Sequence, residues 1–496
     1  MASKRLAYAA FASGASVMIV ELLGSRIIAP FFGSSTYVWS AIIGVILASM
    51  TLGYRYGGRL ADRKPEPQML SRILLGSAAF VMLVPLIGEV AAALSLYAFG
   101  YSVGALFAPL IILALPAFLM GMVSPYAVRL SVKGVDSVGS TSGDLYAVST
   151  AGSIAGTLAC GFVLIPYLHL TTIFYLVCLI LLSASFAVGK GASKGRIAGL
   201  GAVMVLVALL YAPPVISFSG RPVIYSEYTP YSRIAIEEEN GVRYLMLDRG
   251  FEGAMDLKTG YSAYEYVDYF EVPFLQNPGI KDVLVGGGGA GVGPRQIRAN
   301  HPDTTVTVAE INPRVNDAAK KYFNLEEDAS LKVELRDMRL SVKETGRKFD
   351  YVVLDAFNDV STVPYHLVTG EFFKDVRGAL RPGGIFLINM HSPLTGRDSI
   401  LLSSIAKTLG GEFEHLQIYP LGEDPSSRQN IIVLASGSPF LEGDALLLRV
   451  KDTPVIDADR LRKMAAKGRN YTASADGIAF SDDFSPADSL AARMLS

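Results

Sequence analysis

The sequence has 496 residues, of which 51% are hydrophobic and 18% charged, with a formal net charge of −1. A charge this close to neutral gives no reason to expect a nucleic-acid partner. The two cysteines, Cys160 and Cys178, lie in apolar segments, so we expect neither a disulfide nor a metal site. Charged residues are sparse before about residue 216 and reach ordinary density after about residue 220. This change predicts two parts in different solvents.

The first part, residues 1–216, is predicted to be a multi-span helical membrane domain. A spanning helix needs about 20 mostly apolar residues. Seven runs have about this length, and they cover residues 7–30, 37–55, 71–98, 104–128, 143–166, 170–189 and 197–216. Several are rich in glycine, alanine and serine, which let helices approach closely in lipid. We therefore expect a multi-pass protein of the cell membrane, in contact with the lipid bilayer.

Basic residues are distributed unevenly around these runs. Lys4 and Arg5 precede the first run, and further clusters of Lys and Arg follow the second, fourth and sixth. Cytoplasmic loops carry the excess of basic residues, so these ends are predicted to face the cytoplasm. Seven crossings from a cytoplasmic N-terminus would then place the second part of the chain outside.

The second part alternates short β-branched runs with amphipathic helices. The predicted strands are 282–287, 304–311, 331–337, 349–357 and 384–390. Strands separated by helices of this length predict a parallel, doubly wound, Rossmann-like sheet of the methyltransferase-like kind over residues 281–436. Before it, residues 217–280 are predicted to form a small antiparallel β subdomain with a turn at Asn240–Gly241. Residues 437–496 are a C-terminal extension, and their acidic stretch 476–490 favours a solvated tail over a cap on the domain.

Four features lie where predicted strands end, and ligands bind at the carboxyl ends of such strands. The first is a glycine-rich turn in which Gly287, Gly288, Gly289 and Gly291 can bring backbone N–H groups close to a ligand. The others are three carboxylates that end the next three strands, Glu310, Asp337 and Asp355. The turn lacks the Lys-Ser/Thr ending of a phosphate loop, so a nucleoside without a phosphate fits better.

At these residues the chain resembles the spermidine synthase (polyamine aminopropyltransferase) family, and more closely its membrane-fused branch. "SGASVMIVELLGSRIIAPFFGSS" (13–35), "LGYRYGGRLADR" (52–63) and "LDAFNDVSTVPYHLVTGEFF" (354–373) carry the resemblance to that branch. The resemblance implies a donor of the S-adenosylmethionine or decarboxylated S-adenosylmethionine type, with no metal. It also implies a small-molecule amine acceptor, and it is compatible with a homodimer.

The resemblance assigns roles residue by residue. Glu310 falls on the acid that binds the ribose, Asp337 with Met338 on the adenine contacts, and Asp355 on the general base. Ser232 falls where the family has a glutamine that binds the donor in the small β subdomain. Tyr266 falls at the position that contacts the amine, and Tyr264 is the alternative for that position. His366, in a loop after Pro364, is a further catalytic candidate beside Asp355.

One position departs from the family pattern. The family's Gly-Gly-Gly-Asp-Gly holds the amine of the ligand with its aspartate, and here Ala290 stands in its place. If that site is buried, the loss of a charged partner costs roughly 1.5–3 kcal/mol. The adenosine half of the site is therefore expected to be intact and the amine half altered.

Three functions remain open from the sequence. The first is transfer of an aminopropyl group to an amine, with Asp355 as base. The second is methyl transfer from intact S-adenosylmethionine, which the change at Ala290 allows. The third is a transporter or sensor whose second part only binds a nucleoside or polyamine, with Glu21 and Arg26 in the first apolar run as its candidates. Adenosylated donors are cytoplasmic, which conflicts with seven crossings, so the side that the second part faces stays open.

Overall fold

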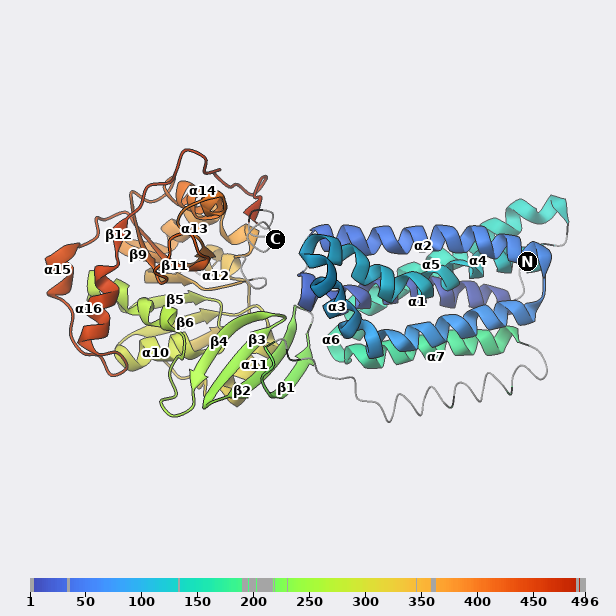
Figure 1. The fold of residues 1–496 in the computed structure, drawn as a ribbon, viewed down its shortest axis with the longest axis horizontal. Helices are drawn as coiled ribbons and strands as arrows, with labels where there is room; N and C mark the ends of the chain where they lie inside the picture. Colours follow the sequence, from blue (N-terminus) through green and yellow to red (C-terminus); the bar gives the residue numbers. More distant parts are fainter. Residues whose placement is uncertain are drawn as a thin grey trace. The chain divides into compact units, whose positions relative to one another are not determined.

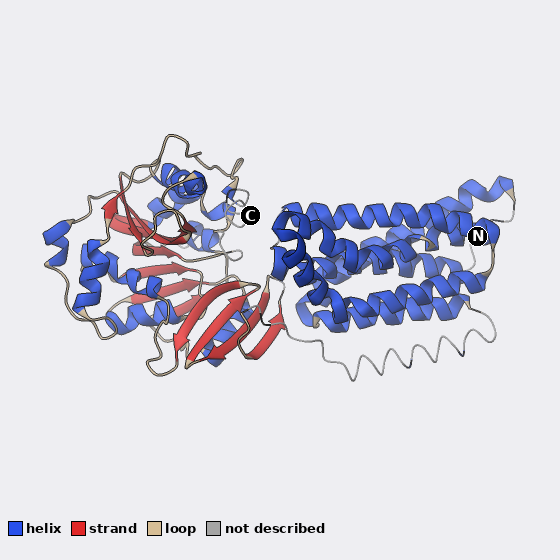
Figure 2. Ribbon diagram, viewed as in Figure 1, coloured by secondary structure: helices blue, strands red, loops and turns tan. Residues whose placement is uncertain are grey.

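The computed structural model describes residues 4–33, 36–132, 134–189, 195, 202, 217, 219–229, 231–344, 346–357, 363–487 and 490. The chain divides into two compact units (Figure 1). The first comprises Met1–Ile216 with Glu227–Ser232, and the second Ser217–Ser226 with Arg233–Ser496. The described elements up to α7, which ends at Val188, are all helical, and those from Val223 onward combine strands with shorter helices (Figure 2).

The helical unit is built from long apolar helices. They are α1 (Lys4–Phe32), α2 (Thr36–Arg63), α3 (Pro67–Gly121), α4 (Val123–Ser131), η1 (Val135–Ser137), α5 (Val138–Ala159), η2 (Cys160–Leu164), α6 (Ile165–Tyr167) and α7 (Leu170–Val188). Six segments among the described residues are long and apolar enough to cross a membrane. They correspond to the first six predicted runs. The seventh predicted run, 197–216, lies outside the described residues apart from residue 202.

Two predicted runs are joined in the structure. The runs at 71–98 and 104–128 form the single element α3, which is interrupted at Gly100 by a non-helical backbone (φ 70°, ψ −173°). A glycine adopts this conformation without the steric cost that a side chain would add. The predicted division into two crossings is retained, as Pro67–Tyr101 and Val103–Ser131.

Close packing between α1 and α5 depends on small residues. A Cβ atom on Gly152 would lie 2.2 Å from the carbonyl oxygen of Phe11, and one on Gly156 would lie 2.6 Å from that of Ala15. On the other helix, a Cβ on Gly14 would lie 2.2 Å from the carbonyl oxygen of Ser149. Gly152 and Gly156 form a Gly-x-x-x-Gly pattern, which lets two backbones approach when no hydrophobic effect drives helices together.

The small sheet of the second half contains four strands in the order β1-β2-β3-β4. These are β1 (Val223–Tyr228), β2 (Arg233–Glu239), β3 (Val242–Leu247) and β4 (Gly250–Asp256). Asn240 and Gly241 connect β2 to β3 with φ angles of 53° and 78°, the two positive values that a tight hairpin turn requires. The predicted antiparallel subdomain and its turn are confirmed.

The large sheet has eight strands in the order β12-β10-β11-β9-β8-β5-β6-β7. They are β5 (Asp282–Gly286), β6 (Thr305–Ala309), β7 (Leu331–Glu334), β8 (Phe349–Leu354), β9 (Leu380–Ser392), β10 (His415–Pro420), β11 (Gln429–Ser436) and β12 (Arg469–Asn470). Strands β7, β6, β5, β8 and β9 run parallel, as predicted. Strands β11, β10 and β12 continue the sheet as antiparallel strands. These three strands were not predicted from the sequence.

Helices cover both faces of this sheet. They are η3 (Glu265–Glu271), α9 (Val272–Gln276), α10 (Val292–Asn300), α11 (Pro313–Tyr322), α12 (Met338–Glu344), η4 (Tyr365–Leu367), α13 (Gly370–Ala379), η5 (Arg397–Ser399), α14 (Ile400–Leu409), α15 (Gly443–Leu447) and α16 (Ala458–Ala466). In β8, Val352 and Leu354 pack with α13 and α14, whereas Tyr351 and Val353 pack with α9 and α16. Successive strand residues point to opposite faces, so the doubly wound arrangement follows from strands that are apolar throughout.

The C-terminal segment packs on the second unit instead of forming a solvated tail. Phe480 is 2% exposed and belongs to the core between the sheet and α13. Its carbonyl oxygen accepts a 3.0 Å hydrogen bond from the amide of Gly370. Asp482 pairs with Arg339 through two hydrogen bonds of 2.8 and 2.6 Å. The expectation of a solvated tail was wrong, because Phe480 lies in an otherwise polar stretch and its partners come from distant helices.

Candidate active site

The four predicted features converge at one edge of the large sheet. Strand β5 pairs in parallel with both β6 and β8, and Gly286 lies opposite Ala309 on one side and Leu354 on the other. The next residue of each strand is therefore Gly287, Glu310 or Asp355. Parallel register alone brings the glycine-rich turn between the two carboxylates.

The turn is held by its neighbours at Gly287. The φ angle of this residue is 94°, and a Cβ atom there would lie 2.1 Å from the carbonyl oxygen of Asp355. Only glycine meets both conditions without a clash. The turn then enters α10 through Gly291, whose φ angle is 69°.

Glu310 is buried and braces the turn. The amide of Gly288 donates to one carboxylate oxygen (2.9 Å) and the amide of Asn312 to the other (2.8 Å). Burial raises the pKa of Glu310, and the backbone hydrogen bonds oppose that rise. Each carboxylate oxygen retains further acceptor capacity for ligand hydroxyls.

Asp337 and His366 form a pair with each other. The Nε2 atom of His366 lies 3.1 Å from Oδ2 of Asp337, and this hydrogen bond is the main cause of the lowered pKa of Asp337. His366 was expected beside Asp355, but its side chain hydrogen-bonds to Asp337. Met338 is 4% exposed and packs against Gly286, where a Cβ would lie 2.5 Å from its sulfur atom.

Asp355 is held between two donors. Nδ2 of Asn389 donates to Oδ1 of Asp355 at 2.8 Å, and the Tyr266 hydroxyl donates to Oδ2 at 3.2 Å. Asn389 is itself fixed by Nδ2 of Asn430, at 3.0 Å. Burial raises the pKa of Asp355 to about 6, although both hydrogen bonds lower it. A carboxylate with a pKa close to the working pH can accept a proton and release it again.

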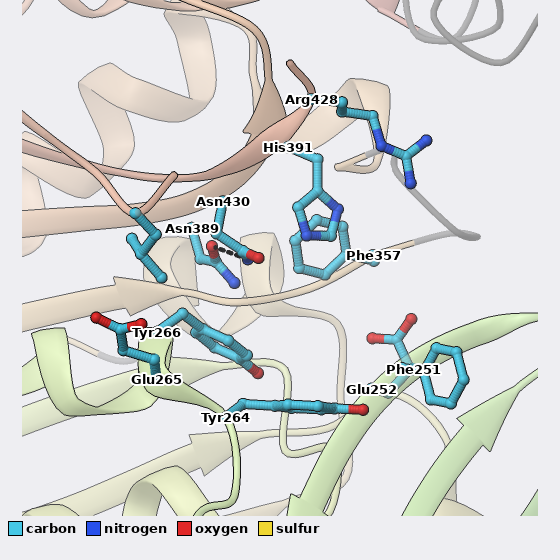
Figure 3. Close-up of a pocket in the computed structure, with 11 residues that line it drawn as sticks. Phe251, Glu252, Tyr264, Glu265, Tyr266, Phe357, Asn389, His391, Arg428 and Asn430 are labelled. Carbon is cyan, nitrogen blue, oxygen red and sulfur yellow. Dashed lines mark hydrogen bonds between the residues drawn. The ribbon is translucent and has the colours of Figure 1, made fainter. Parts of the chain in front are cut away.

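A cleft of about 340 Å³ opens beside Tyr266 (Figure 3). One wall comes from β4 and η3, and the opposite wall from β9, β11 and the loop that follows β8. Its lining residues are Phe251, Glu252, Tyr264, Glu265, Tyr266, Phe357, Asn389, His391, Leu421, Arg428 and Asn430. Aromatic rings and carboxylates on one wall suit a cationic amine, because ring faces and anions both attract positive charge.

A smaller pocket lies under the glycine-rich turn. Glu252, Tyr266 and Asp355 line it, together with Gly287 to Ala290. Glu252 and Tyr266 line this pocket and the larger cleft alike. The two spaces are therefore adjacent at Glu252 and Tyr266, and the Tyr266 hydroxyl donates a hydrogen bond to Asp355.

Sequence reasoning found part of this site. Tyr264 and Tyr266, the two candidates for the amine-contacting position, both line the cleft. Ser232 lies just before β2 and lines neither pocket. Asn358 and Asp359 lie outside the described residues.

Several lining residues were missed, among them Glu252, Asn389 and His391. Asn389 carried a usable signal, since it is a polar residue inside an apolar strand. A buried amide needs partners, and here it has both Asp355 and Asn430.

Residues 268–420 match the family model described as the spermine/spermidine synthase domain. The matched stretch contains the glycine-rich turn, Glu310, Asp337 and Asp355. The four strands of the small sheet, which include Glu252, precede the matched residues, and so does Tyr266 of η3.

Curated relatives carry the corresponding names. A probable polyamine aminopropyl transferase from Bifidobacterium longum is 34% identical over 130 residues, which cover 26% of this chain and only 28% of that protein. A polyamine aminopropyltransferase from Vibrio vulnificus is 27% identical over 238 residues, covering 46% of this chain and 75% of that protein. Polyamine aminopropyltransferase 2 from Aquifex aeolicus is 22% identical over 428 residues, covering 80% of this chain and 81% of that protein. The last match is longer than the second unit, so it extends into the helical unit.

Proposed function

We propose that the synthase domain transfers an aminopropyl group from decarboxylated S-adenosylmethionine to an amine. The observation that carries this proposal is the half-buried Asp355, which lines the smaller pocket and accepts a hydrogen bond from Tyr266 of the larger cleft, with a pKa raised to about 6 by desolvation. The relatives named as polyamine aminopropyltransferases support the reaction class.

The adenosine part of the donor is assigned to the strand ends. Glu310 accepts hydrogen bonds from the ribose hydroxyls, since its carboxylate is already oriented by the amides of Gly288 and Asn312. Asp337, fixed by His366, lies at the end of the next strand and contacts the adenine. The turn at Gly287 allows the backbone to approach the sulfonium centre without a side chain in the way.

The transfer itself is a displacement at carbon. The acceptor amine first gives a proton to Asp355, and its lone pair then forms a bond to the propyl carbon next to the sulfonium. The carbon–sulfur bond breaks, and its electron pair stays on sulfur, so neutral methylthioadenosine leaves. The sulfonium is already an activated leaving group, so positioning and proton removal are the enzyme's main tasks.

The test uses the full-length chain in detergent, with labelled decarboxylated S-adenosylmethionine, labelled S-adenosylmethionine and a panel of aliphatic amines. We expect aminopropyl transfer, and a loss of at least about 100-fold in kcat for Asp355→Asn, because the amide cannot accept the proton. Methyl transfer from the intact donor would favour a methyltransferase, which the alanine at position 290 allows. Transfer from neither donor would contradict the enzymatic proposal.

We also propose that the helical unit is embedded in a membrane. Its six long helices support this, and so does their surface, on which large apolar side chains such as Leu47 (59%), Leu94 (62%) and Phe162 (76%) are exposed. A water-soluble unit rarely leaves so many apolar side chains uncovered. Fractionation of cells should recover the chain in the membrane pellet after carbonate washing, and recovery in the supernatant would contradict the proposal.

A further inference from the structure

Glu252 lies at an irregularity in β4. Leu245 of β3 pairs with Gly253, whereas the next residue, Met246, pairs with Phe251. Glu252 is therefore an extra residue between two pairs, which is a β-bulge. Bulges change the direction of a side chain and are enriched next to active sites. Here the bulged residue lines both the larger cleft and the smaller pocket.

The bulge packs directly on the glycine-rich turn. A Cβ on Gly289 would lie 2.7 Å from the carbonyl oxygen of Glu252, and a Cβ on Gly253 would lie 2.5 Å from the Cβ of Ala290. Ala290 is only 2% exposed. The strand that carries Glu252 thus lies against the alanine whose position, by resemblance, belongs to the carboxylate that holds an amine.

Glu252 also faces the proposed reaction centre. The Glu252 side chain lies across the cleft from Phe357 and beside Tyr264 (Figure 3). Burial raises the pKa of Tyr266, and the negative charges of Asp355 and Glu252 raise it further. A ligand cation in this region would therefore meet two carboxylates, those of Asp355 and Glu252.

We propose that the carboxylate of Glu252 binds the ammonium group of the donor's aminopropyl chain, in place of the aspartate that Ala290 replaces. This inference rests on the proposed function. An ammonium–carboxylate pair is a charge-assisted hydrogen bond, which is stronger than a neutral one. Intact S-adenosylmethionine carries a carboxylate beside the same ammonium, and Glu252 repels that carboxylate. Glu252 therefore selects the decarboxylated donor.

Calorimetry of the full-length chain in detergent tests this, with decarboxylated S-adenosylmethionine, intact S-adenosylmethionine and methylthioadenosine as ligands. Glu252→Gln should weaken binding of the decarboxylated donor at least tenfold, and should leave methylthioadenosine within twofold of the wild type. The ratio between the affinities for the decarboxylated and the intact donor should therefore become smaller. Asp459→Asn, which removes an exposed carboxylate on α16, is the matched control and should change none of the three affinities.

Each outcome decides a separate question. If the wild type binds neither the decarboxylated donor nor methylthioadenosine, the proposed function fails. If the wild type binds both and Glu252→Gln keeps its affinity for the decarboxylated donor, only the role of Glu252 fails. Glu252→Asp keeps the charge and should retain part of the donor preference. If Glu252→Gln and Glu252→Asp both lose affinity equally for all three ligands, a specific contact with the ammonium group is contradicted.

Discussion

At the level of single residues, the site depends on how Asp355 is surrounded. Its burial favours the neutral acid, whereas Asn389 and Tyr266 each donate a hydrogen bond that favours the anion. The resulting pKa of about 6 leaves the carboxylate ionised at neutral pH. It is also more basic than an ordinary aspartate, which suits the removal of a proton from an amine.

Asn389→Ala should move the acid limb of the pH profile of kcat/KM upward by about one pH unit. The hydrogen bond from Asn389 stabilises the ionised carboxylate, so its loss raises the pKa of Asp355, and activity requires the ionised form. A hydrogen bond to a charged group contributes about 1.5–3 kcal/mol, and about 1.4 kcal/mol corresponds to one pH unit. Asn430→Ala is the control and should shift the acid limb less, because Asn430 contacts Asn389 and not Asp355 directly. An unchanged acid limb in Asn389→Ala would remove Asp355 as the group that titrates there.

At the level of elements, the order of the parallel strands builds the proposed nucleoside site. The turn after β5 lies between the ends of β6 and β8 because β5 pairs with both. The antiparallel strand β11 then brings Asn430 beside β9, where it pairs with His391 in the register of the ladder. The polar wall of the cleft thus combines residues of β9, the last parallel strand, with Asn430 of the antiparallel strand β11.

Gly287→Ala should abolish nucleoside binding and destabilise the fold around the turn by more than about 2 kcal/mol. The new Cβ would meet the backbone of Asp355 at 2.1 Å, in addition to the cost of about 1–2 kcal/mol for a positive φ. Gly396→Ala is the matched control. Gly396 also has a positive φ of 87°, but a Cβ there meets no atom within 4 Å. Calorimetry with methylthioadenosine checks both variants, and equal affinities would contradict the steric argument.

Phe480→Ala should destabilise the second unit by about 3–5 kcal/mol, the range for removing a buried aromatic ring. Phe480 is 2% exposed, whereas Phe484, four residues later, is 58% exposed. Phe484→Ala should therefore change stability by no more than about 0.5 kcal/mol. Amide hydrogen exchange in β9 and α13 measures the difference. Similar protection in the two variants would show that the C-terminal segment does not stabilise the domain.

At the level of the whole molecule, two units with different surfaces belong to one chain. The helical unit exposes large apolar side chains, and the α/β unit places its apolar residues between its sheet and helices. Each unit therefore has an interior of its own, which agrees with the division near residue 216. The match to the Aquifex aeolicus relative extends over parts of both.

Gly152→Val should reduce the yield and thermal stability of the chain extracted in detergent. A side chain at this position would meet the backbone of Phe11 on α1, and helices in lipid associate mainly through close packing. Gly143→Val lies on the same helix, where a Cβ meets no atom within 4 Å, and is the matched control. Size-exclusion profiles and melting curves of the two variants should differ, and identical behaviour would contradict the α1–α5 contact.

The features that the sequence determined by itself are local. Apolar runs of spanning length, β-branched runs and the carboxylates that follow the strands are all local patterns, so six long apolar helices, five parallel strands and the positions of Glu310, Asp337 and Asp355 after those strands could be predicted. Parallel register then requires that residues at successive strand ends meet. The resemblance added roles to these positions and identified Ala290 as a departure.

Only the tertiary structure decided which distant residues meet. It brought Asn389 and Asn430 to Asp355, paired His366 with Asp337, and buried Phe480 under α13. It also placed Glu252 at a bulge beside Ala290. Such contacts join residues far apart in the chain. The sequence around each residue is the same whether or not the residue meets its partner, so local patterns do not predict the contact. A bulge depends on the pairing of two strands, which neither strand specifies alone.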